Sequence, residues 1–246
     1  MRYITLVHSS NNDIADSATD SSGAEHEGLS AFGEEVVKEM NRLGIMVDVS
    51  HASDDVFFDA IAVSEAPIIA THSNARSVTE HQRNMSDEML RLMAEPGGVV
   101  QLTLLSSYLR DEPQNPERSA ALQELRSSMK SLNEMTPEER AERRLAFNEI
   151  NEKFPTPLAT VEHVVDHIDH MVSIAGIDHV GIGCDFDGGG GIDGVFDASE
   201  VMNITIELVR RGYSEEDIEK IWGKNVMRVF EDVQKIAEVI QARTLS

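Results

Sequence analysis

Three histidines and one aspartate each follow an apolar run of the sequence. His8 comes after ITLV, His51 after VDVS, His72 after PIIAT and Asp185 after VGIGC. Imidazole and carboxylate side chains bind divalent metals and transfer protons. Where such groups repeatedly stand at the point at which a buried strand gives way to a loop, they indicate an active site at the carboxyl end of a parallel sheet. The pattern therefore predicts a metal-dependent site.

A single histidine at a strand end is more often structural than catalytic. Four such residues in one pattern favour function, because buried imidazoles and carboxylates are costly without partners. Period-two alternation places His51 on the same side of its strand as Val49, facing inward. It likewise places Asp185 on the side of Gly181 and Gly183. Because glycine has no side chain, we expect open space there for a metal, a water or a substrate.

Three further histidines are weaker candidates. His163, His167 and His170 lie in TVEHVVDHIDHMV, which is apolar at helical spacing and contains a pair four residues apart that could hold zinc. At 100° per residue, however, all three fall opposite the face that contains Val164 and Ile168. We therefore expect them on a solvated helix face.

The remaining candidates each have an ordinary alternative. Cys184 is expected to point away from Asp185, which argues against a nucleophilic role. Arg83, in the loop EHQRNMS, could bind a carboxylate through a bidentate fork or be a surface arginine. Asp48 and Asp187 could orient their neighbours or simply bond to loop amides.

The composition is that of a globular protein with a strong negative charge. The 246 residues are 41% hydrophobic and carry a formal net charge of −23, which repels nucleic acid and anionic membranes. No run approaches the ~20 apolar residues of a membrane span, and the amino terminus does not resemble a signal peptide. The single cysteine excludes an intrachain disulfide. We expect a cytoplasmic protein, or a periplasmic or extracellular one if a signal-bearing segment precedes Met1.

Five short segments rich in β-branched residues predict strands: YITLV, GIMVDVS, APIIATHS, GGVVQLTLL and DHVGIGCDF. Amphipathic helices are predicted after the capping residues Ser30, Ser53 and Ser86, and another after a capping box at Ser214. Alternation of strands and helices predicts an α/β fold with a parallel sheet.

Residues 110–158 interrupt this alternation. The segment is strongly charged, has prolines at both ends and contains a helix start at Thr136 and Pro137. We predict a helical insertion before the last strand, within a single domain that spans residues 1–246. It could be a lid over the site, a contact surface for a second copy, or a solvated helical hairpin.

The stretch from His8 to Phe230 resembles the membrane dipeptidase (renal dipeptidase) family of zinc metallopeptidases. The matching segments are LVHS, GLSAFGEEVVKEMNRLGIMVDVSHAS, APIIATHSNARSV, RNMSDE, HIDHMVSIAGIDHVGIGCDFDG and NVMRVFE. The resemblance implies a (β/α)8 TIM barrel whose two-zinc site hydrolyses dipeptides through metal-activated water, without a covalent intermediate.

The resemblance also implies a role for each candidate. His51 and His72 would be ligands of one zinc, while His8 would contact the substrate and stabilise the tetrahedral oxyanion. Asp185 would be the acid/base carboxylate near the bridging water.

Substrate binding is implied for two more residues. Arg83 of the RN pair and Tyr108 of SSYL would hold the backbone carboxylate of the substrate. A dipeptide is therefore the expected small-molecule partner.

The chain also departs from the family pattern. Family members carry a His-x-Asp motif on the first barrel strand and a metal-bridging Glu on a later one, both upstream of where this chain begins. We therefore expect a partial TIM barrel of about five of eight βα units. His51 and His72 alone would form at most one partial zinc site in place of two. The open sheet would expose strand edges, which favours a homo-oligomer.

Two functions from different classes follow. The first is a zinc-dependent dipeptidase. The alternative is a truncated, catalytically impaired barrel fragment that acts only in binding or assembly. A third possibility, within catalysis, is another amidohydrolase specificity on the same site, such as hydrolysis of β-lactams or N-acyl amino acids.

Overall fold

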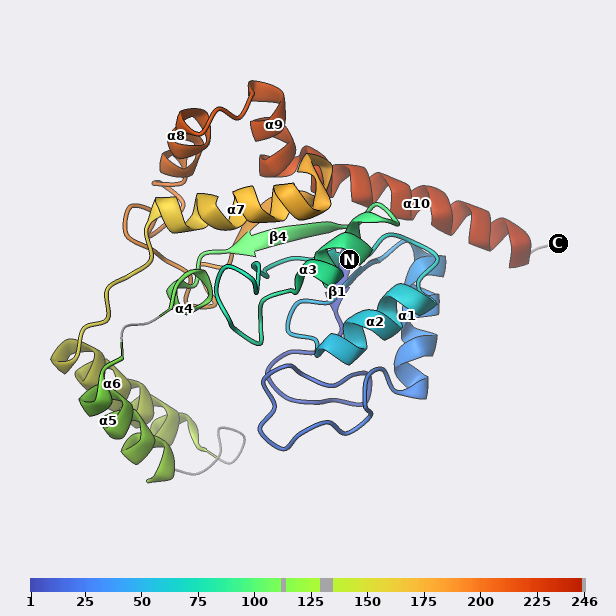
Figure 1. The fold of residues 1–246 in the computed structure, drawn as a ribbon. Coiled ribbons are helices and arrows are strands. Elements are labelled where there is room, and N and C mark those ends of the chain that lie inside the picture. The colour runs from blue at the N-terminus through green and yellow to red at the C-terminus, as the bar shows by residue number, and fades with distance from the viewer. Residues whose placement is uncertain (112–113, 129–134, 245–246) are drawn as a thin grey trace. The chain divides into compact units, whose positions relative to one another are not determined.

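Five parallel strands form one sheet, in which each strand lies beside its neighbours in the chain. The strands are β1 (Tyr3–Thr5), β2 (Met46–Asp48), β3 (Ile69–Ala70), β4 (Val99–Thr103) and β5 (Val180–Cys184), of which Figure 1 labels β1 and β4. This computed structural model describes residues 1–111, 114–128 and 135–244. The predicted α/β class and the parallel sheet of five strands are confirmed.

Serine side chains begin several of the helices. Ser30, Ser53 and Ser86 each accept a hydrogen bond from the backbone N–H three residues further on, as predicted. Ser214 forms the predicted capping box with Asp217. The helices are α1 (Ala31–Leu43), α2 (Asp54–Val63), α3 (Asp87–Ala94), α4 (Ser106–Leu109), α7 (Val161–Ala175), a 3-10 turn (Ile177–His179), α8 (Met202–Arg210), α9 (Glu215–Glu219), a π-helical turn (Lys220–Lys224) and α10 (Asn225–Thr244).

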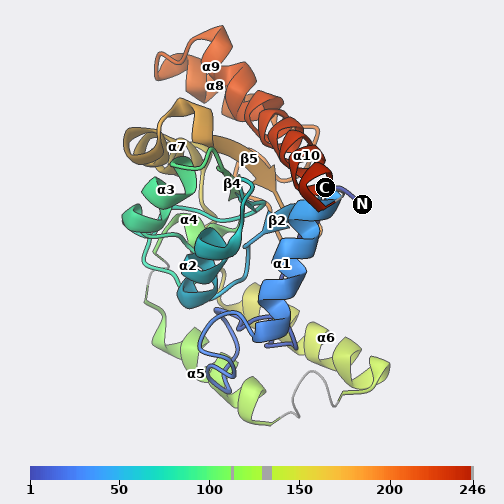
Figure 2. The same cartoon turned by 90° about the vertical axis from the view of Figure 1, so that its right-hand side faces the viewer.

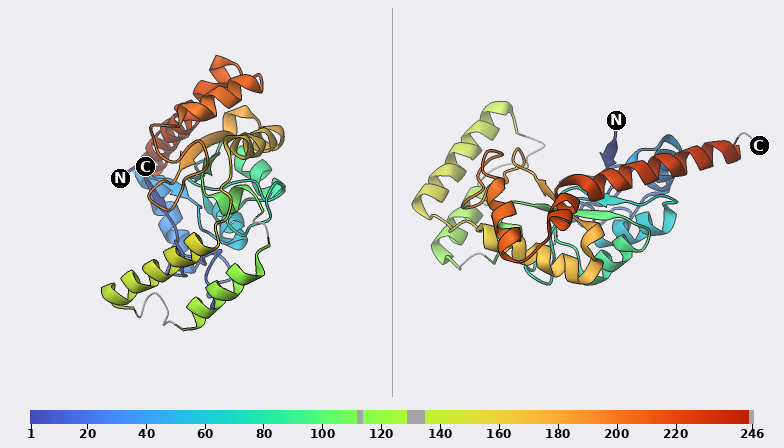
Figure 3. Two further views of the ribbon diagram at one scale, coloured as in Figure 1. Left: turned by 90° about the vertical axis from the view of Figure 1, so that its left-hand side faces the viewer. Right: turned by 90° about the horizontal axis from the view of Figure 1, so that it is seen from above.

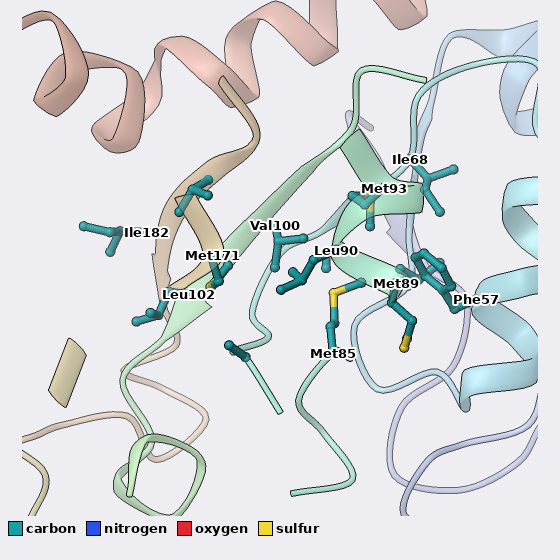
Figure 4. Packing of buried hydrophobic residues seen from close by; sticks show 14 of the residues in the cluster. Phe57, Ile68, Met85, Met89, Leu90, Met93, Val100, Leu102, Met171 and Ile182 are labelled. Atoms are coloured by element: carbon teal, nitrogen blue, oxygen red, sulfur yellow. The ribbon is translucent and has the colours of Figure 1, made fainter. Parts of the chain in front are cut away.

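The main core lies between the sheet and several helices, among them α1, α2, α3 and α7. It includes Phe57 of α2, Leu90 of α3, Val100 of β4 and Met171 of α7, all buried (Figure 4). Full burial of one large aliphatic or aromatic side chain contributes roughly 1.5–3 kcal/mol relative to exposure. This core therefore fixes the sheet on which the strand-end residues stand.

The opposite face of the sheet is partly covered by α10. A second cluster there comprises Met46, Ala66, Ile69, Val99, Val229 and Val233. Figures 2 and 3 show α10 running beside α1. Gln241 of α10 donates to the carbonyl of Arg42 at 2.7 Å. A groove of about 370 Å³, lined in part by Tyr3, Gln101 and Phe230, remains on this face.

Residues 111–158 form a second compact unit, which contains α5 (Pro116–Ser127) and α6 (Pro137–Lys153). The helix start predicted at Thr136 and Pro137 is confirmed, and Thr136 and Glu139 also make a capping box at the start of α6. The predicted insertion at residues 110–158 is thus helical. Its membership of a single domain and its role as a lid or contact surface stay predictions. Among the helices of the described residues, none is long and apolar enough to cross a membrane.

His167 lies in the core and not on the solvated face that helical periodicity predicts. Its side chain is fully buried, and its Nδ1 accepts a hydrogen bond from the Ala75 N–H at 3.1 Å. Its Nε2 lies 3.2 Å from the carbonyl oxygen of Leu109. The prediction was wrong for this residue because the loop after β3 and the end of α4 supply backbone partners at the edge of the apolar face. Burial lowers the pKa of His167 to about 4.

We predict that the neutral, buried His167 makes the protein less stable in mild acid. The unfolded chain takes up the proton near the ordinary pKa of 6.5 and the folded chain near 4. Stability should therefore fall by up to about 1.4 kcal/mol per pH unit as the pH is lowered through this window. Urea titrations at a series of pH values should show this slope, and His167→Gln should flatten it. Parallel curves for wild type and variant would contradict the prediction.

Candidate active site at the carboxyl ends of the strands

The three strand-end histidines lie together. His8 follows β1, His51 follows β2 and His72 follows β3. The ring centroids of His8 and His51 are 4.1 Å apart, and those of His51 and His72 are 4.8 Å apart. His8 is exposed, while the other two are partly buried. Because parallel strands end at the same edge of a sheet, the structure brings these three predicted site residues into one place.

A turn positions the side chain of His51, because the strand and its alternation of side chains end before this residue. β2 ends at Asp48, and His51 has a φ of 71°, in the left-handed region that few non-glycine residues adopt. Val49 packs into the main core, but the turn sends the imidazole of His51 toward the other two histidines. The side of Val49 therefore does not predict the direction of His51.

A loop after β1 holds two of the histidines through their backbones. The Ser17 hydroxyl donates to the carbonyl of His8 at 2.6 Å, and the Ala18 N–H donates to the carbonyl of His51 at 2.8 Å. The buried carboxylate of Asp16 accepts hydrogen bonds from the N–H groups of residues 25, 26 and 28 in the same loop. These bonds stiffen the loop and so fix the backbone of the site.

The two partly buried imidazoles are neutral at neutral pH. Burial, with a smaller contribution from the positive charge of Arg83, lowers the pKa of His51 to about 3. Burial also lowers the pKa of His72, although the negative charges of Asp48 and Asp185 oppose this effect. A neutral imidazole has the free lone pair that a metal ligand requires.

Arg83 lies inside the site. Only 4% of the residue is exposed, so the alternative of an ordinary surface arginine is wrong. Its Nη2 donates to the carbonyl of His72 at 3.2 Å, and its guanidinium carbon lies 5.8 Å from the centre of the Tyr108 ring. Its Nε is buried without a hydrogen-bond partner. A buried guanidinium with a donor to spare suits a bidentate contact with a carboxylate.

Tyr108 of α4 is held by two neighbours that the sequence alone does not reveal as site residues. Its ring packs on that of His81, with centroids 4.2 Å apart. The Asn84 side chain donates to the Tyr108 carbonyl at 2.8 Å. Asn84 directly follows Arg83, and this adjacency to a candidate ligand is the one sequence signal that could have indicated it.

The glycine at position 183 serves close packing, and the open space predicted beside it is absent. A Cβ atom at this position would lie 1.9 Å from the carbonyl oxygen of Thr71, so the backbone after β3 fills the volume. Asp185 follows with a φ of 69°, beyond the end of β5. The missing side chain of Gly183 therefore lets the ends of β3 and β5 approach. This contact brings Asp185 within electrostatic reach of His72.

The described residues do not form a complete metal site by themselves. In residues 1–111, 114–128 and 135–244, no three His, Cys, Asp or Glu side chains are grouped so that they could hold one ion. Cys184 packs against the main core, and burial raises the pKa of its thiol to about 11. Zinc sites in proteins use three or four protein donors, which is more than the pair of His51 and His72 would supply alone.

Curated relatives are fungal dipeptidases of greater length. Dipeptidase verJ of Clonostachys rogersoniana is 36% identical over 241 residues, which are 96% of this chain and 50% of that protein. Dipeptidase tcpJ of Claviceps purpurea (strain 20.1) is 34% identical over 238 residues, which are 96% of this chain and 46% of that protein. The chain therefore spans about half the length of the curated relatives it matches.

Solved structures share the fold. The probable dipeptidase PvdM from Pseudomonas aeruginosa has a TM-score of 0.81 and 36% identity, over 96% of this chain and 63% of that one. A metallo peptidase from Rhodobacter sphaeroides, solved with a phosphinate mimic of the dipeptide L-Ala-D-Ala, has a TM-score of 0.71 and 28% identity, over 95% of this chain and 56% of that one. The membrane dipeptidase family model matches residues 1–244, and this chain accordingly belongs to the membrane dipeptidase family, peptidase family M19.

Proposed function

We propose that this chain contributes part of the active site of a zinc-dependent dipeptidase, which hydrolyses the peptide bond of dipeptides. One observation carries the proposal: imidazoles from three successive strand ends meet, and the buried Arg83 is bonded to the carbonyl of one of them, His72. Membership of a dipeptidase family supports the same function.

The zinc ligands that we propose in this chain are His51 and His72. Both imidazoles are neutral, which is the form in which histidine binds zinc. Bound zinc would lower the pKa of a water ligand and polarise the scissile carbonyl. Two donors make a partial site, so the remaining ligands would come from the rest of a longer polypeptide or from a second copy of this chain.

The other residues would bind the substrate and move its protons. Arg83 and Tyr108 would hold the carboxylate of the dipeptide, because a guanidinium forms paired hydrogen bonds with the two carboxylate oxygens. His8, exposed beside His51, would donate to the oxygen that becomes negative in the tetrahedral intermediate. Asp185 would take a proton from the attacking water and pass it to the leaving amine.

A second function is favoured by the incomplete ligand set in the described residues. A catalytically impaired barrel fragment would keep the binding groups and act only in binding or assembly. For either function we propose a homo-oligomer, because β1 and β5 are edge strands whose unpaired backbone groups favour association.

We predict that zinc binds through His51 and His72. Purified chain that is loaded with zinc and freed of excess should retain up to about one ion per monomer, and His72→Ala should lose it, because too few donors remain. Elemental analysis gives the ratio. His163→Ala removes an imidazole from α7 and serves as the control. Close to two ions per chain would indicate ligands from a neighbouring copy, whereas equal retention by wild type and His72→Ala would contradict the ligand assignment.

We predict that Asp185→Asn abolishes peptide hydrolysis and leaves zinc bound. The amide cannot transfer the proton, and loss of general acid–base catalysis costs about 10²–10⁴ in rate. Release of free amino acids from a dipeptide measures turnover. The control is Asp187→Asn, an exposed residue of the same loop, which should keep most of the activity. Wild-type protein that binds dipeptide without turnover would favour the impaired fragment.

We predict that Arg83→Lys weakens substrate binding, because lysine keeps the charge but cannot form the paired contact. The loss of one charged hydrogen bond, roughly 1.5–3 kcal/mol, should raise KM at least about tenfold. Arg91→Lys on the exposed surface of α3 is the control. A dipeptide amide, which lacks the carboxylate, should bind wild type and Arg83→Lys equally. An unchanged KM for the free dipeptide would refute the role of Arg83.

A further inference from the structure

Asp48 is the centre of a hydrogen-bond network beneath the candidate site. Its side chain is fully buried at the end of β2. One carboxylate oxygen, Oδ1, accepts the backbone N–H groups of Ser50 at 3.0 Å and Thr71 at 2.9 Å. The other, Oδ2, accepts the hydroxyls of Thr5 at 2.6 Å and Thr71 at 2.7 Å. Four donors fill the acceptor positions of an ionised carboxylate, so Asp48 has no proton to give.

The hydroxyl of Thr71 also contacts His72, with Oγ1 2.7 Å from Nδ1. A hydroxyl has a single proton, and that of Thr71 is donated to Asp48. Its oxygen can therefore only accept from the imidazole, so Nδ1 of His72 must carry the hydrogen. The Ser50 hydroxyl oxygen, 3.4 Å from Thr71 Oγ1, is a more distant acceptor for this proton than the Asp48 carboxylate at 2.7 Å, so the proton of Thr71 stays with Asp48. A neutral imidazole with its proton on Nδ1 has its lone pair on Nε2.

We propose that Asp48 and Thr71 are positioning residues, which fix the tautomer and direction of the His72 ring so that Nε2 is free to bind the metal. This inference rests on the proposed function in assigning His72 as a zinc ligand. Metal-binding histidines generally donate their other N–H to an oxygen that orients the ring and raises its basicity. Here the carboxylate of Asp48 acts on His72 indirectly, through the Thr71 hydroxyl.

The same carboxylate connects the three strands that carry the histidines. Thr5 lies three residues before His8, Asp48 lies three before His51, and Thr71 directly precedes His72. Thr5 and Thr71 both donate hydrogen bonds to the carboxylate of Asp48. The network thus sets the relative position of the strand ends as well as the direction of one ring.

The tautomer can be measured without metal by nitrogen NMR of the full chain labelled with ¹⁵N-histidine. The His72 signals are assigned by their loss in His72→Gln. At neutral pH, wild-type His72 should be protonated on Nδ1 and unprotonated on Nε2. Thr71→Val removes the hydroxyl and should abolish this preference, and Thr71→Ser should restore it. Asp48→Asn offers an amide N–H to Thr71, frees the hydroxyl proton for His72, and should move the imidazole proton to Nε2.

Zinc affinity, measured by competition with a chelator, is the second readout. Thr71→Val should bind zinc about 10- to 100-fold more weakly than wild type and Thr71→Ser. The control is Thr103→Val, which removes a buried hydroxyl at the end of β4 that bonds to the Cys184 carbonyl at 3.2 Å. It should change neither the tautomer nor the affinity.

Three results would overturn the proposal: a wild-type His72 protonated on Nε2, a tautomer unchanged in Thr71→Val, or an equal loss of zinc affinity in both valine variants. Failure of the proposed function is distinguishable from these. If wild type binds no zinc but the tautomer responds to Thr71 as expected, the zinc assignment fails and the positioning of the ring stands.

Discussion

The common direction of the strands is the constraint on which the site depends. Because all five strands are parallel, their carboxyl ends meet at one edge, and residues far apart in sequence become neighbours there. His8, His51 and His72 come from three successive turns at this edge, and Asp185 comes from a fourth. The apolar core beneath the sheet holds the strands in register. The geometry of the site therefore follows mainly from packing, and contacts among the polar residues refine it.

Much of this arrangement can be read from the sequence, because the signals for it are local. β-branched runs, serine caps and a polar residue at each strand end are all visible within a few positions. The direction of the His51 side chain and the packing role of Gly183 have no such local signal in the sequence. The first depends on a left-handed turn that begins where strand alternation ends. The second depends on the carbonyl of Thr71, which is remote in sequence and meets Gly183 only in the folded sheet.

The burial of polar groups is also difficult to predict from local sequence signals. Helical periodicity describes the average face of α7, yet His167 is buried because backbone groups of Ala75 and of Leu109 in α4 pair with both of its nitrogens. Asp48 is buried because hydroxyl and N–H donors from three strands converge on it. Burying a polar group is unfavourable unless its partners are in place, and those partners belong to other segments. A sequence can identify such a residue as a candidate, but only the fold supplies the groups that make its burial possible.

Burial of the Arg83 side chain costs more free energy than the hydrogen bonds of its guanidinium recover. Burial lowers the pKa of its guanidinium, which means that the charged form is disfavoured relative to water, and Nε has no partner. The free protein thus bears a desolvation cost that a bound carboxylate would offset with paired, charge-assisted hydrogen bonds. A neutral group at the same place would leave that cost uncompensated. In the proposed dipeptidase, the free protein would therefore already favour substrates with a free carboxyl terminus. The neighbouring histidines would limit hydrolysis to a peptide bond close to that terminus.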